Sequence, residues 1–167
     1  MKLTLTIAIV IATCFTNLAS LTVSTDRPYW HFCNKCHVMF SSEDGSGKCA
    51  AGETHEAQGF EFRLPFDGVE TKHTQTNWRR CRNCHALFYN GYPDKGHCPA
   101  GGAHVAEDTF RYNLPHDVPG TSTAQTDWRF CNKCHAMFYD GFTDKGVCAA
   151  GGGHVAQGFN FVLPHGR

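Results

Sequence analysis

The chain has 167 residues, which is enough for one compact domain or a short array of small ones. Its 15 Lys and Arg residues balance 15 Asp and Glu residues, so the composition predicts neither a basic face for nucleic acid nor an acidic block. Ten Cys and 11 His residues are the unusual part of the composition.

The N-terminal segment predicts a secretory signal peptide. Lys2 precedes an apolar run over residues 3–15, and the small residues Ala19 and Ser20 follow. The run is shorter than the ~20 residues that span a bilayer, which disfavours a transmembrane anchor. We therefore expect cleavage after residues 1–20 and a secreted, extracellular protein with no membrane span after signal removal.

Three copies of one unit follow the signal peptide. Each copy opens with W-x2-C-x2-C-H, continues to C-x5-H, and ends in an alternating aromatic, aromatic, Leu, Pro run. The copies are predicted at residues 28–66, 76–116 and 126–165, joined by polar linkers. An internal repeat of this kind predicts three versions of one structural unit, which either stand apart or form one domain.

The number of cysteines in each repeat predicts metal sites. Removal of Cys14 with the signal peptide leaves nine cysteines, three per repeat, and an odd number cannot all pair as disulfides. Three Cys and one His per copy make the four ligands of a tetrahedral zinc site. The predicted ligands of the three zinc ions are Cys33, Cys36, Cys49 and His55; Cys81, Cys84, Cys98 and His104; and Cys131, Cys134, Cys148 and His154.

Two other interpretations of the cysteines stay open. One is a single disulfide per repeat, which an oxidising compartment favours. The other is haem c, because C-x2-C-H is also the attachment motif of c-type haem. Haem would leave the third Cys of each repeat without a role, and the surrounding pattern is strand-like. The tight turn formed by each C-x2-C step is called the knuckle. The residues that follow it, His37, His85 and His135, are therefore interpreted as polar residues that do not bind metal.

The strand pattern predicts an all-β fold. Short apolar segments lead into and out of each C-x2-C step, which predicts a hairpin with two ligands at its tip. The closing run alternates with period two, as in a half-buried strand, and no stretch has sustained helical periodicity. We expect three zinc-ribbon-like repeats, either strung in a line or, as we favour, closed into a pseudo-threefold, β-trefoil-like domain. The Trp residues and the closing runs would form its shared core.

A turn found only in the second and third copies suggests a ligand site. Both copies read Gly-aromatic-x-Asp-Lys-Gly, with Tyr92 and Asp94 in one and Phe142 and Asp144 in the other. Aromatic faces flanked by polar groups suit sugar rings or protein partners, although the pattern favours the simpler interpretation that these aromatics cover the C-x2-C turn of their own repeat. The four residues are the candidate ligand-binding set.

The motif W-x2-C-x2-C-H-x2-F followed by G-x-C-[AP]-A-G-x2-H resembles tandem Cys/His repeats of secreted microbial proteins. The resemblance covers about residues 28–165. Such repeats have no established activity, so the resemblance implies no particular function. In similar repeats the residue after C-x2-C is not always His, which favours zinc over haem.

The sequence as a whole predicts a binding module and no enzyme. A catalytic zinc keeps an open position for water, whereas three Cys and one His close the coordination shell. We expect an extracellular, lectin-like binding protein whose partner is a glycan or protein surface. The alternatives are a multihaem electron carrier and a metal-sequestering protein.

Overall fold

The structure is a computed structural model that describes residues 25–166, so the predicted signal peptide lies outside the described residues. Within this range all regular elements are strands, which confirms the all-β prediction. No helix of residues 25–166 is long and apolar enough to cross a membrane. The strands are β1 (Asp26–Cys33), β2 (Met39–Ser41), β3 (Ala57–Pro65), β4 (Thr74–Arg80), β5 (Leu87–Tyr89), β6 (Tyr112–Pro115), β7 (Ala124–Cys131), β8 (Met137–Tyr139) and β9 (Ala156–Pro164).

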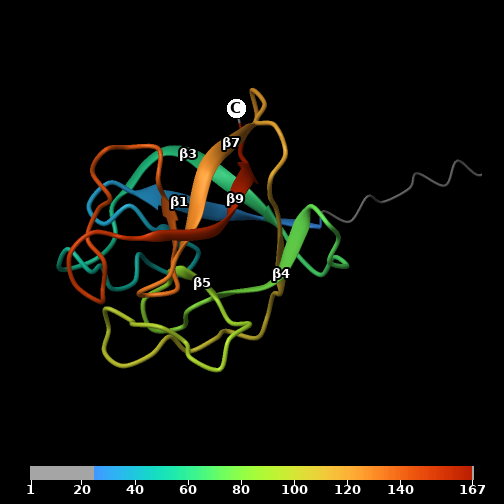
Figure 1. Cartoon of the computed structure of the whole chain (residues 1–167). Coiled ribbons are helices and arrows are strands. Elements are labelled where there is room, and N and C mark those ends of the chain that lie inside the picture. Colours follow the sequence, from blue (N-terminus) through green and yellow to red (C-terminus); the bar gives the residue numbers. More distant parts are fainter. Residues whose placement is uncertain (1–24, 167) are drawn as a thin grey trace, which may run out of the picture.

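Each repeat folds into a three-stranded antiparallel sheet with its first strand in the centre. The strand orders are β2-β1-β3, β5-β4-β6 and β8-β7-β9. The predicted hairpin is confirmed, since the strand that leaves each C-x2-C step pairs back on the strand that leads into it. The closing run supplies the third strand, and in Figure 1 the sheets of the first and third repeats lie side by side around β1, β3, β7 and β9.

The three repeats contact one another in a ring. Strand β2 bridges to the second repeat, β5 to the third, and β8 back to the first. The residue pairs are Phe40 with Ala86, Phe88 with Ala136, and Phe138 with Val38. A linear string would leave repeats 1 and 3 apart, so it does not describe these contacts. The strands nevertheless form three separate sheets, and a β-trefoil stays a prediction.

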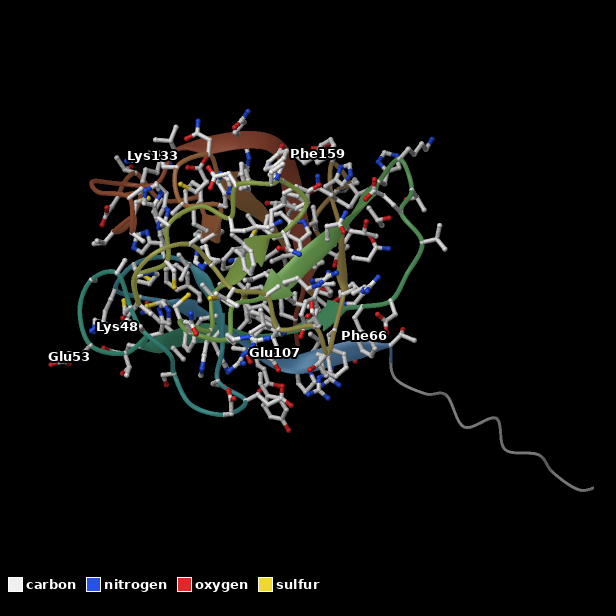
Figure 2. All side chains as sticks on the ribbon, turned by 90° about the horizontal axis from the view of Figure 1, so that it is seen from below. Lys48, Glu53, Phe66, Glu107, Lys133 and Phe159 are labelled. Atoms are coloured by element: carbon white, nitrogen blue, oxygen red, sulfur yellow. The ribbon has the colours of Figure 1, made fainter. Side chains whose placement is uncertain are left out.

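Two layers of buried side chains fill the ring. In one layer the Trp of each repeat meets an aromatic ring of the next repeat edge-on, each time with ring centroids 5.1 Å apart. The three pairs are Trp30 with Tyr112, Trp78 with Phe161, and Trp128 with Phe62. The other layer holds the nine cysteines of the described residues, with Phe40, Phe88 and Phe138. Figure 2 shows the sulfur atoms gathered toward the end of the molecule where Lys48 and Lys133 lie.

In repeats 1 and 3 the closing run enters the core only from its second aromatic residue, which corrects the expectation that the whole run is buried. Phe62 is 1% exposed, but Phe60 is 45% exposed. The pairing of β1 with β3 shifts between His31 and Phe32, which leaves Gly59 and Phe60 in a bulge. Gly59 has a φ of 79°, a value that suits glycine at such a bulge.

Repeat 3 has the same bulge at the same place. The pairing of β7 with β9 shifts between Arg129 and Phe130. Gly158 has a φ of 74°, and the next residue, Phe159, is 40% exposed. In both repeats the bulge turns an aromatic ring out of the core and onto the surface.

Candidate metal centres and surface grooves

The structure brings together the four predicted ligands of each repeat. Their ligand atoms lie within 4.8 Å of one another in all three clusters, and all 12 residues are buried. In the first cluster, Sγ of Cys33 lies 3.9 Å from Sγ of Cys49, and Sγ of Cys36 lies 3.4 Å from Nδ1 of His55. The matching distances are 3.9 and 3.5 Å in the second cluster. They are again 3.9 and 3.5 Å in the third. These groups are called the Cys/His clusters below.

The clusters have the dimensions of a tetrahedral metal centre. Zinc with Zn–S bonds near 2.3 Å and Zn–N bonds near 2.0–2.1 Å places two sulfurs about 3.8 Å apart and a sulfur and nitrogen about 3.6 Å apart. A disulfide needs sulfurs near 2.05 Å, and the cysteines of residues 25–166 are free thiols. Each cluster can therefore hold one metal ion.

A carbonyl of the next repeat orients each cluster histidine. Nε2 of His55 lies 3.1 Å from the carbonyl oxygen of Cys84, the second knuckle cysteine of repeat 2. His104 makes the same contact with Cys134 at 3.1 Å, and His154 with Cys36 at 3.0 Å. A carbonyl only accepts, so Nε2 carries the hydrogen, and in the neutral ring Nδ1 has a lone pair toward the thiols. Such an outer-shell bond is typical of metal-binding histidines.

The same knuckle carbonyl is approached by a glycine of the neighbouring repeat. A Cβ atom on Gly96 would lie 2.2 Å from the carbonyl oxygen of Cys134. The corresponding distances are 2.2 Å for Gly47 and 2.4 Å for Gly146, and all three glycines have a φ near 60°. Because no side chain fits between the backbones, glycine at this place lets consecutive repeats pack at the metal layer.

Asp94 and Asp144, two of the candidate ligand-binding residues, hold these glycines. Asp94 Oδ1 accepts a hydrogen bond of 2.9 Å from the N–H of Gly96, and Asp144 accepts one of 3.0 Å from Gly146. Neither carboxylate lines the surface grooves described below. We therefore assign both residues to the turn that supports the next knuckle.

The electrostatics of the clusters favour a cation. Hydrogen bonds from Cys36 and Cys49 hold the pKa of Cys33 far below its usual range, whereas hydrogen bonding to Cys33 and Cys49, with burial, raises that of Cys36 far above it. Burial lowers the pKa of His55, but Cys33 and Cys49 raise it more, to about 9. Three crowded thiols thus resist full ionisation, and a divalent ion would supply the charge that stabilises three thiolates.

The histidine that follows each C-x2-C step lies outside its cluster. His37, His85 and His135 have φ values of 67°, 64° and 66°, and each N–H closes the knuckle by donating to the first cysteine's carbonyl. The thiols of the same step are buried and point to the third Cys and the cluster His. This geometry favours a metal ion over haem, which would need those two thiols for its own attachment.

Grooves open at the surface in all three seams where repeats meet, and two of them have aromatic and amide linings. The Phe142 groove lies between repeats 3 and 1 and has a volume of about 260 Å³. It is lined by Phe32, Gln58 and Phe60 of repeat 1 and by Gln125, Tyr139 and Phe142 of repeat 3. The Tyr92 groove lies between repeats 2 and 3 and has a volume of about 230 Å³. It is lined by Phe130, Gln157 and Phe159 of repeat 3 and by Gln75, Tyr89 and Tyr92 of repeat 2.

Tyr92 and Phe142 do not cover their own knuckles. The Phe142 ring lies 5.7 Å from the ring of His37 in repeat 1, and the Tyr92 ring lies 5.9 Å from that of His135 in repeat 3. Each turn therefore covers the knuckle of the next repeat and forms one wall of a groove there.

The seam between repeats 1 and 2 is charged. Arg27 pairs with Glu43, and Arg80 pairs with both Asp44 and Glu107. The guanidinium of Arg27 also lies over the ring of Phe110, 4.2 Å from its centre. A groove of about 300 Å³ lies here too, lined by these residues and Thr109. Arg27, Glu43 and Arg80 stand at sequence positions that line the other two grooves, so charged side chains replace most of the aromatic and amide lining. This set is called the charged seam below.

Of the four candidate ligand-binding residues, only Tyr92 and Phe142 line the grooves. Reasoning from the sequence assigned most of the other lining residues to no site, among them Gln58, Phe60, Gln157 and Phe159. The available signal was the segment A-Q-G-F, which occurs at residues 57–60 and 156–159 but reads E-D-T-F at 107–110. The period-two pattern instead places these phenylalanines in the core.

Comparison with known proteins finds no protein-family model, curated protein or solved structure that matches the chain. What the structure supports directly is a set of tandem Cys/His repeats with three buried clusters that can bind metal.

Proposed function

We propose that the protein is a secreted, zinc-stabilised repeat protein that acts as an extracellular binding module for carbohydrate or cell surfaces. The observation that carries this proposal is that every repeat combines a buried Cys/His cluster with aromatic residues that line a surface groove. The Cys/His clusters would supply stability, and the grooves would supply a binding surface.

Zinc is the metal that fits the clusters best. Three thiolates and one imidazole in a tetrahedral set are a common structural zinc site. Four protein ligands leave no open position for water, so we assign these centres a structural role and propose no enzyme activity. Each repeat has only three short strands, and a metal supplies stability that so small a core lacks.

An extracellular location rests on the predicted signal peptide and on the resemblance to repeats of secreted microbial proteins. Ligation to zinc would also explain how an odd number of cysteines remains reduced outside the cell. Two grooves on one chain would favour polymeric or repetitive surfaces, because binding at one site raises the effective concentration at the other.

Metal analysis and a cell-binding assay test this proposal. Protein secreted without added chelator should contain about three zinc ions per chain, one for each four-ligand cluster. The zinc-loaded protein should be retained on intact microbial cells, and protein stripped with chelator should not. A disulfide-bonded protein without zinc would contradict zinc binding by the Cys/His clusters. Failure of the zinc-loaded protein to bind cells would contradict its role as a binding module.

Two rival functions make different predictions. A multihaem carrier would show a Soret band, which the zinc protein lacks. A metal-sequestering protein would exchange zinc quickly with a weak chelator, whereas the burial of all 12 ligands predicts slow exchange.

A further inference from the structure

We propose that the Phe142 and Tyr92 grooves each seat one uncharged sugar ring of a glycan, and that the charged seam seats none. The inference rests on the proposed function, which it sharpens from a surface-binding module to a two-site glycan binder.

The groove walls match the two sides of a pyranose ring. Phe142 and Phe60 come from different repeats and are 49% and 45% exposed in one groove, and Tyr92 and Phe159 are 48% and 40% exposed in the other. Aromatic faces suit the C–H face of a sugar, and the glutamine amides beside them suit its hydroxyl rim. No Asp, Glu, Lys or Arg lines either groove, so the ligand it fits is neutral.

The polar groups are held in place before any ligand binds. Gln125 Oε1 accepts a hydrogen bond of 3.0 Å from the indole N–H of Trp128, and Gln75 makes the same bond with Trp78 at 3.0 Å. This fixes each amide and leaves its NH₂ group with no hydrogen-bond partner among residues 25–166. A fixed donor of this kind binds a hydroxyl with little loss of side-chain entropy.

The aromatic walls are also fixed. The Phe60 ring stacks on His165 with centroids 3.7 Å apart, and Phe159 stacks on His116 at the same distance. An imidazole therefore supports each ring, and the wall needs no rearrangement to receive a flat apolar face.

Groove size favours single sugar units over a peptide. Volumes of about 260 and 230 Å³ fall below the ~300–1,000 Å³ of sites for drug-sized ligands. A proline-rich peptide also packs on aromatic rings, but it lies along a continuous groove. Here the two grooves lie in different seams, which suits separate units of a branched or surface-bound glycan.

The tryptophans offer one reporter for each seam. The chain has three Trp residues: Trp128 contacts the Phe142 groove through Gln125, Trp78 contacts the Tyr92 groove through Gln75, and Trp30 lies three residues after Arg27 of the charged seam. A sugar in the grooves should shift the indole N–H NMR resonances of Trp78 and Trp128 and leave that of Trp30 unchanged. The probes are glucose, mannose, galactose and N-acetylglucosamine, with insoluble chitin, β-glucan and mannan for retention.

Single variants separate the two grooves in the zinc-loaded protein. Phe142→Ala should abolish the sugar-induced shift of Trp128 alone, and Tyr92→Ala that of Trp78 alone. Because two linked sites give avidity, either change should weaken retention on the polysaccharide by about 10²-fold or more. Glu43→Ala, at the matching turn of the charged seam, should change neither shift nor retention. Three zinc ions in each variant, and an unchanged Trp30 resonance in the two groove variants, show that the fold persists.

The outcomes distinguish failure of this inference from failure of the proposed function. If the protein is retained on cells but no sugar shifts Trp78 or Trp128, the glycan sites are wrong and the binding module stands. Shifts caused by a proline-rich peptide instead of sugars would also overturn the inference, as would sugar-induced shifts that survive both alanine changes. If the protein binds neither cells nor sugars, both proposals fail.

Discussion

The charged seam and the two aromatic grooves are built on the same backbone plan, and they differ because each seam takes half of its lining from each of two repeats. Repeat 3 has both halves: the turn with Phe142 and the A-Q-G-F segment with Phe159. Repeat 1 lacks the turn aromatic, and repeat 2 lacks A-Q-G-F. The ring brings these two deficient halves together in one seam, so both losses fall at the same site and two complete grooves remain.

The metal layer shows no such divergence. All three clusters keep four ligands, the histidine contact to the next knuckle and the close approach of a glycine. The comparison teaches that the clusters and their contacts are needed at every seam to close the ring, whereas the groove lining is free to vary from seam to seam.

Metal removal should have the largest effect, because it should disrupt the contacts between repeats at all three seams. Structural zinc contributes roughly 10–16 kcal/mol in small zinc-dependent peptides, and domains of this size have a total stability of about 5–15 kcal/mol. Dialysis against a strong chelator should therefore unfold the chain, with loss of dispersion in all three Trp indole resonances. Restoring zinc should bring the resonances back. Selective loss of the aromatic grooves with the charged seam intact would break the comparison.

The next largest effect is expected from His104→Ala, which touches two clusters at once. The change removes a ligand from the second cluster and the hydrogen bond to the carbonyl of Cys134 in the third. The second cluster should lose its zinc. The third should bind zinc more weakly, by up to the ~10–100-fold that loss of an outer-shell partner costs. Zinc release to a coloured chelator, followed over time, measures both effects.

His85→Ala is the matched control for that change. His85 belongs to the same repeat, lies next to Cys84 and is not part of the cluster. It should leave three zinc ions bound and cause a smaller loss of thermal stability. Equal zinc loss from His85→Ala and His104→Ala would contradict the assigned ligand set.

The sequence alone predicts the metal layer well and the grooves only in part. Cys98 and His104 are recognisable because four ligands at fixed spacing recur in three copies, and metal chemistry dictates which side chains meet. Phe60 could not be placed, because period-two alternation assigns it to the same face as Phe62, and only the bulge at Gly59 turns it outward. Which repeat's turn meets which repeat's strand depends on the order of repeats around the ring, a long-range property absent from any local pattern.

A moderate and equal effect is expected from glycine changes at different seams. Gly96→Ala beside the Tyr92 groove and Gly47→Ala in the charged seam each place a Cβ 2.2 Å from a knuckle carbonyl, at a φ near 60°. A left-handed conformation costs a non-glycine residue roughly 1–2 kcal/mol, and the clash adds to it. Thermal denaturation should give similar losses for both. Markedly different losses would show that the metal layer, too, differs between seams.

The smallest effect is expected from the ion pairs of the charged seam. Glu43→Gln removes the partner of Arg27, and both side chains are partly exposed, at 40% and 27%. Exposed ion pairs contribute about 0–1 kcal/mol and are screened by salt. Urea denaturation should therefore show a loss of at most about 1 kcal/mol at low salt, and less in about 1 M salt, where the screening length falls to about 3 Å. The control is Phe142→Ala, whose loss of apolar packing should not depend on salt. A large, salt-independent loss from Glu43→Gln would mean that the ion pairs hold repeats 1 and 2 together. A small loss would mean that the metal layer holds them together, and that the charged lining of this groove is not needed to close the ring.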